Sequence, residues 1–154
     1  MMSLWATSAL WVCGLGMAPL VLGASQALRW ERDSLARGQA VLLAQDLSHR
    51  LHLNATSARS YQLGWGQQPT SPECRHAPCS RSEWAQADLA AWRGQVAQQL
   101  PDGDAWLQAS AEAEPTRWLV LAWSSQAGGE AISTPRPPVS CPEGKRCQAW
   151  ILSP

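Results

Sequence analysis

The chain has 154 residues, twelve of them basic and twelve acidic, so its formal net charge is zero. A neutral chain has no field that would attract a polyanion, and we expect no nucleic-acid partner. Ten tryptophans and no phenylalanine predict a core built around indole rings.

An uncharged, largely apolar run extends from Leu4 to Leu28. About 20 apolar residues span the hydrocarbon core of a bilayer, so we expect residues 1–28 to form a membrane-spanning helix. Four residues in this run would destabilise a helix in water: Gly14, Gly16, Pro19 and Gly23. Membrane helices tolerate such residues, and small side chains let neighbouring helices approach closely. The run is therefore expected either to pack against other helices or to serve as a plain lipid anchor.

Residues 29–53 continue the helix in amphipathic form. Apolar residues recur there at spacings of three and four, which is the pattern of one helical face: Ala36, Ala40, Leu43, Leu47 and Leu51. The opposite face carries Arg37, Asp46, His49 and Arg50. We therefore predict one unbroken helix from Leu4 to Leu53, whose second half buries a stripe against a globular head formed by residues 54–154. His49 and His52 lack a third ligand at a matching spacing, so we predict solvated histidines and no metal site.

The cysteines indicate an oxidising compartment. Apart from Cys13 in the apolar run, they form two close pairs, Cys74 with Cys79 and Cys141 with Cys147. Two local disulfides are the favoured interpretation. A four-thiolate zinc site is the alternative, although neither pair has the two-residue spacing usual in a zinc knuckle.

The head begins with a segment rich in glycine and proline, 54–80, which we predict to be a loop. Ser80 and Glu83 form a capping box that opens a second helix. The apolar stripe of that helix is Ala85, Leu89, Trp92, Val96 and Leu100. The helix is predicted to end at Pro101, and Asp102 with Gly103 to form a turn. Asp102 and Asp104 lack the further oxygen ligands that a calcium-binding loop requires, so we favour the turn.

Three strands are predicted after the second helix, at 105–111, 116–124 and 148–152. Both faces of the second strand are apolar, which predicts a central position in a small sheet. We expect Trp92, Trp118 and Trp123 to build the head.

No catalytic motif occurs in the chain. It has no serine on a glycine elbow, no glycine-rich phosphate loop and no metal-binding helix motif, and its acidic residues are scattered. We therefore predict that the protein is not an enzyme, carries no cofactor and has no small-molecule substrate.

Three short groups of residues occur in a characteristic order. The first is Ala40 to Leu47 followed by Arg50 and Asn54, the second is Asp88, Leu89 and Trp92 leading to Leu100–Gly103, and the third is Val120 to Trp123. In this order they resemble the type IV pilus modification protein family called PilV, whose members are minor pilins. The resemblance implies an α+β, type IV pilin-like fold, in which a long N-terminal helix packs on a small antiparallel sheet with one additional short helix.

The resemblance also implies a function and a location. A minor pilin of this kind contributes to pilus priming or to the pilus tip, with its first helix in the bacterial inner membrane and its head in the periplasm. Its partners are other pilins and the pilus assembly machinery. Such pilins carry a leader glycine and an early glutamate, whereas Met2, Ser3 and Thr7 stand at the corresponding places here. Either the true start lies upstream, or the entry signal is degenerate.

Two alternatives stay open at the level of sequence. A pseudopilin of a type II secretion system belongs to the same class of protein. A secreted periplasmic binding module, released by cleavage after Ala27, belongs to a different one.

Overall fold

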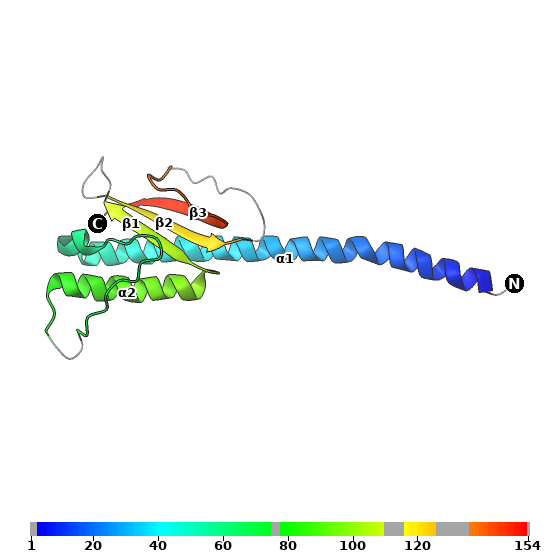
Figure 1. Cartoon of the computed structure of the whole chain (residues 1–154), viewed down its shortest axis with the longest axis horizontal. Helices are drawn as coiled ribbons and strands as arrows, with labels where there is room; N and C mark the ends of the chain where they lie inside the picture. The colour runs from blue at the N-terminus through cyan, green and yellow to red at the C-terminus, as the bar shows by residue number, and fades with distance from the viewer. Residues whose placement is uncertain (1–2, 75–77, 110–115, 126–135, 154) are drawn as a thin grey trace.

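The computed structural model describes residues 3–74, 78–109, 116–125 and 136–153, and their side chains from residue 26 onward (Figure 1). The elements in chain order are α1 (Ser3–Leu53), the 3-10 helix η1 (Ala55–Ser60), α2 (Arg81–Gln99), β1 (Asp104–Ala109), β2 (Arg117–Ser124) and β3 (Lys145–Leu152). The fold is α+β, with a long helix, a second helix and a small antiparallel sheet, as the sequence predicts.

Helix α1 is one continuous helix of 51 residues, about 75 Å long at 1.5 Å per residue. Figure 1 shows its second half beside the sheet and α2, and its first half extending beyond them. The predicted stripe is confirmed, because Ala40, Leu43, Leu47 and Leu51 are each at most 2 % exposed and Ala36 is also buried. The second half of α1 is therefore the spine of the head.

Helix α2 begins with the predicted capping box. The Ser80 hydroxyl accepts a hydrogen bond from the Glu83 backbone N–H, and the Glu83 carboxylate accepts one from the Ser80 backbone N–H. The whole predicted stripe of α2 is buried. The Trp92 indole donates to the carbonyl of Leu43 at 3.0 Å, so this large ring enters the core with its polar atom satisfied.

The sheet has the order β1-β2-β3, with both pairs antiparallel, so the central position of β2 is confirmed. Leu119, Leu121 and Trp123 on one face of β2 join the core that α1 and α2 cover. Val120 and Ala122 on the other face belong to a second, smaller cluster. Trp118 is only partly buried and packs against this second cluster, whereas Trp92 and Trp123 lie in the first.

Element boundaries differ from the prediction where sequence periodicity is weak. The segment 54–80 is not all loop, since it contains η1 and a bridge between Leu63 and Leu107 beside the edge of β1. Strand β3 begins at Lys145, three residues earlier than predicted, because its register with β2 continues to Ser124. The predicted end of the first strand, residues 110–111, lies outside the described residues.

No helix among the described residues is both long enough and apolar enough to cross a membrane. The side chains of residues 1–25, which make up most of the predicted membrane-spanning segment 1–28, lie outside the description. The same holds for Gly14, Gly16, Pro19 and Gly23.

Candidate functional site

A row of three exposed leucines follows the surface of α1. Leu28, Leu35 and Leu42 are 55 %, 63 % and 57 % exposed. Seven residues turn an α-helix by about 20° less than two full turns, so the three side chains lie on one side of α1. Single exposed apolar residues are ordinary on a protein surface, but an aligned row on one helix indicates a contact surface. We call Leu28, Leu35 and Leu42 the leucine row.

Gly38 lies between Leu35 and Leu42 of the leucine row, and no contact in the described part of the chain requires a glycine there. An added Cβ would meet nothing within 4 Å, and the residue sits inside a regular helix. Glycine in a helix interior costs about 1 kcal/mol relative to alanine. The missing side chain leaves room for another molecule to approach the backbone of α1 closely at this position.

Two further exposed apolar residues are Leu53, at the end of α1, and Trp84, in the first turn of α2. The two helices run antiparallel, since Leu43 contacts Trp92 while Arg50, further along α1, pairs with Asp88, earlier in α2. Leu53 lies about one turn after Arg50, and Trp84 lies about one turn before Asp88. Both residues therefore lie at the end of the head away from the N-terminus, where α1 stops and α2 starts.

A polar network joins α1, α2 and the segment after η1 at this end of the head. Arg50 pairs with Asp88 and, at 2.8 Å, with Asp46. The buried Tyr61 hydroxyl donates to Asp88 at 2.8 Å and accepts from the Asn54 amide. Burial, together with the hydrogen bond to Asp88, raises the pKa of Tyr61 far above its usual value, so the phenol stays neutral. The network fixes the two helices relative to each other.

A second polar cluster, which we call the Asp33 clasp, lies where α1 leaves the head. Asp33, with a side chain only 6 % exposed, accepts hydrogen bonds from Arg37, from Arg146 on β3 and from Ser125 just after β2. Burial opposes the ionised carboxylate, but the bonds from Ser125 and Arg37 and the charge of Arg146 outweigh it and lower the pKa of Asp33. The clasp attaches the sheet to the first buried turn of α1.

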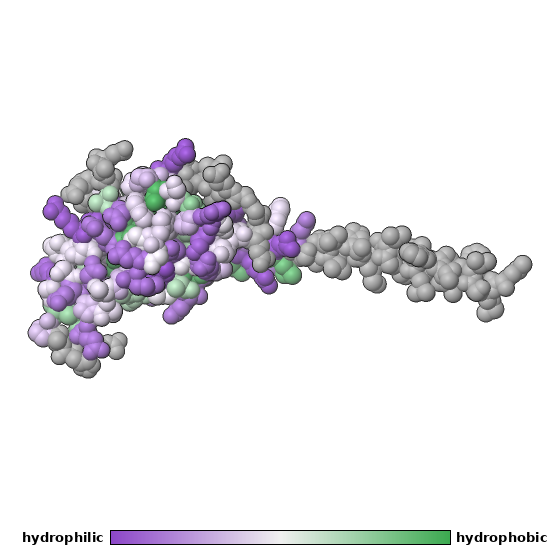
Figure 2. All heavy atoms as spheres, in the orientation of Figure 1, coloured by the Kyte–Doolittle hydropathy of each residue, from purple (hydrophilic) through white to green (hydrophobic). Residues whose placement is uncertain are grey.

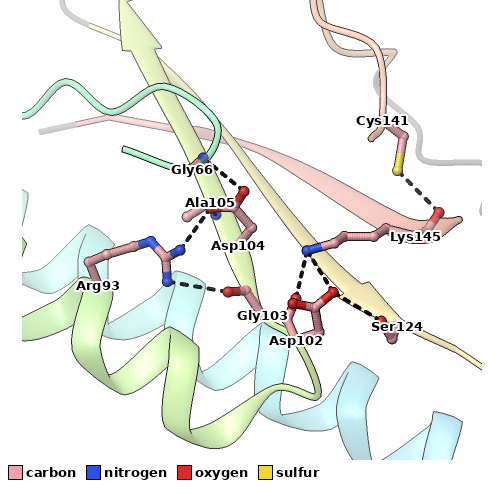
Figure 3. Close-up of polar contacts among 9 residues, drawn as sticks. All are labelled: Gly66, Arg93, Asp102, Gly103, Asp104, Ala105, Ser124, Cys141 and Lys145. Carbon is pink, nitrogen blue, oxygen red and sulfur yellow. Dashed lines mark hydrogen bonds and ion pairs between the residues drawn. The ribbon is translucent and has the colours of Figure 1, made fainter. Parts of the chain in front are cut away.

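The aspartates at the turn between α2 and β1 bind neighbouring side chains and backbone groups of the head (Figure 3). Asp102 has a positive φ of 50° and pairs with Lys145, while Asp104 pairs with the buried Arg93 at 2.9 Å and accepts from the Gly66 N–H. Gly103 is required, since a Cβ there would lie 2.4 Å from the Val96 carbonyl oxygen. Both aspartates thus have basic partners, which agrees with a turn rather than a cation loop.

The four head cysteines form the two expected disulfides, Cys74–Cys79 and Cys141–Cys147. The zinc alternative is therefore wrong for these thiols. Across the described ranges, no three His, Cys, Asp or Glu side chains gather closely enough to hold a metal ion. His49 and His52 are exposed on α1, as expected.

One open pocket of about 440 Å³ lies between the N-terminus of α2 and the loop before it. Hydroxyl groups of Ser60, Thr70, Ser71 and Ser82 line much of it. Its carboxylate, Glu83, is held by the capping box, and Gln86 donates to the Ser60 carbonyl. Glu83 and Gln86 are thus both engaged in local structure.

The leucine row was not predicted from the sequence. The face of α1 opposite the buried stripe was expected to be polar, whereas that side carries the leucines as well as Asp46 and His49. The seven-residue spacing of Leu28, Leu35 and Leu42 was the available signal.

No family model, no curated protein and no solved structure matches this chain.

Proposed function

We propose that the chain is a minor pilin-like protein of a type IV pilus, of the kind that its resemblance to the PilV family implies. It is held in the bacterial inner membrane by residues 1–28, with its head in the periplasm. It acts by packing against other pilins during priming or at the pilus tip, and not by catalysis. The two disulfides of the head suit an oxidising compartment such as the periplasm.

The two-sided character of α1 carries this proposal. One side of the helix is buried against its own head, while the other side keeps the leucine row exposed. The row begins where the uncharged run from Leu4 to Leu28 ends, so a single helix offers an apolar surface along most of its length. Exposing such a row to water is unfavourable by about 25 cal/mol per Å² of apolar surface. A neighbouring helix that covered the row would remove this cost.

The partner that fits the leucine row is another helix of the same kind. Leucines at a seven-residue spacing lie along one side of a helix, where they can contact a second helix that crosses at a shallow angle. Gly38 leaves room for the backbone of such a partner between Leu35 and Leu42. The row thus favours an assembled protein over a freely soluble binding module.

Photo-crosslinking in cells tests the surface. A photoreactive amino acid at position 35 is expected to give crosslinks to other pilins, whereas the same residue at position 98 should give few. Gln98 is the control, because it is exposed on α2, on the side of that helix opposite its buried stripe. Equal crosslinking from both positions would remove the leucine row as the contact surface.

Deletion of the gene tests the system in which the protein works. We expect fewer surface pili and reduced surface motility, both restored by the intact gene. Normal pili combined with loss of secreted enzymes would instead select a pseudopilin of a type II secretion system. A soluble native product whose N-terminal residue is Leu28 would select the secreted module.

A further inference from the structure

The segment of α1 between the apolar run and the head has an unusual composition. Residues 26–32 are exposed, and Trp30, at 73 %, is among the most exposed apolar side chains of the described chain. Arg29 and Arg32 flank this tryptophan, and Leu28 precedes it. Figure 2 shows hydrophobic and hydrophilic residues side by side where the described side chains of α1 begin. We call Leu28, Arg29, Trp30 and Arg32 the collar.

The collar keeps a net positive charge because the nearest aspartate, Asp33, binds residues of the head instead of Arg29 or Arg32. The Asp33 carboxylate points to the head, where Arg37, Arg146 and Ser125 bind it in the Asp33 clasp. Within the described ranges, neither Arg29 nor Arg32 takes part in an ion pair. Glu31 is then the one acidic side chain that opposes the two arginines in the exposed segment.

The position of the collar follows from the length of the apolar run. A helix from Leu4 to Leu28 is about 37 Å long, slightly more than the roughly 30 Å of a bilayer's hydrocarbon core. Arg29 to Arg32 would then occupy the next 6 Å or so, at the level of the lipid headgroups. Tryptophan is enriched at this level, and arginine can extend its charge into the headgroup layer while its methylene groups stay in apolar surroundings.

We propose that the collar is a binding surface for anionic phospholipid headgroups, which Arg29 and Arg32 attract and beside which Trp30 inserts. This inference rests on the proposed membrane anchoring of residues 1–28. Contact with the headgroups would place the base of the head directly on the membrane, because the Asp33 clasp follows the collar by one residue. The lipid surface thereby fixes how far the other two leucines of the row, Leu35 and Leu42, stand from the membrane.

Lipid-selective quenching of Trp30 tests the proposal. The whole chain is reconstituted into phosphatidylcholine vesicles that carry a small fraction of headgroup-labelled quencher, either phosphatidylglycerol or phosphatidylcholine. The contribution of Trp30 is the difference between the unmodified chain and W30F. We expect the anionic quencher to be more effective, by up to about fivefold for each arginine, and less so at high salt. The R29Q/R32Q variant should lose the preference.

The R59Q/R81Q variant is the matched control, because it removes two exposed arginines at the far end of the head. It should keep the full preference for the anionic quencher. Equal quenching by the two lipids, or a preference that survives in R29Q/R32Q, would overturn the proposal while leaving membrane anchoring intact. Failure of the unmodified chain to float with vesicles of any composition would overturn both.

Discussion

Replacing Gly38 by alanine should stabilise the isolated protein and weaken its assembly. The new methyl group meets nothing within 4 Å, and the residue already has helical geometry, so no strain opposes the change. The gain in helix propensity is about 0.5 to 1 kcal/mol. For a chain of this size, such a gain raises the melting temperature by about 2 to 4 °C per kcal/mol. The near-ultraviolet circular dichroism of the buried Trp92 and Trp123 reports this unfolding.

The same methyl group lies between Leu35 and Leu42, where the proposed partner helix approaches. We therefore expect G38A to give fewer crosslinks from position 35 and fewer pili, despite its higher melting temperature. Gly94 supplies the control, since it also lies inside a helix with nothing within 4 Å of an added Cβ, but on α2. G94A should be stabilised by a similar amount and assemble normally. If G38A assembled as well as G94A, the argument from Gly38 to a close partner would fail.

Three further predictions concern the head. D33N should lower the free energy of unfolding by about 2 kcal/mol, because it removes the negative charge that pairs with the buried Arg146. The folded-state pKa of Asp33 is lowered, so its stabilisation is present at neutral pH and is lost as the pH falls through that pKa. Acid titration of the melting temperature should therefore be shallower for D33N than for the unmodified chain. W92F should lower the free energy of unfolding, measured in urea, by about 1 to 3 kcal/mol, because the core loses side-chain volume and one hydrogen bond. The loss stays moderate because the Leu43 carbonyl keeps its hydrogen bond within the helix. Serine pairs in place of either disulfide should each cost about 2 kcal/mol, with Cys141–Cys147 the more costly because Cys147 is buried against the sheet. A larger loss for Cys74–Cys79 would show that burial does not decide the difference.

The elements that sequence reasoning predicted correctly have strong local signals. The stripe of α1 repeats over more than four turns, and Ser80 with Glu83 marks the start of α2 by its own hydrogen bonds. Strand β2 was placed at the centre because both of its faces are apolar, and the structure covers each face with a separate cluster.

The features that were missed depend on contacts distant in sequence. Lys145 and Arg146 are polar, and only pairing with β2 and bonds to Asp102 and Asp33 place them in a strand. The strand's own alternation does not specify which face of β2 meets the helices, and the structure places Leu119, Leu121 and Trp123 on that face. The leucine row was overlooked because apolar residues on a helix are normally assigned to the protein's own core.

The Asp33 clasp also has a consequence for the time course of synthesis. Its two ends, Asp33 and Arg146, are separated by 113 residues along the chain. At 5 to 20 residues per second, Arg146 is made roughly 6 to 23 seconds after Asp33. During that interval α2, β1 and β2 are completed in turn, but the sheet beside the buried stripe of α1 still lacks its last strand. The clasp can therefore close only when synthesis of the chain is almost finished, so the attachment of the sheet to the base of α1 is among the last contacts to form.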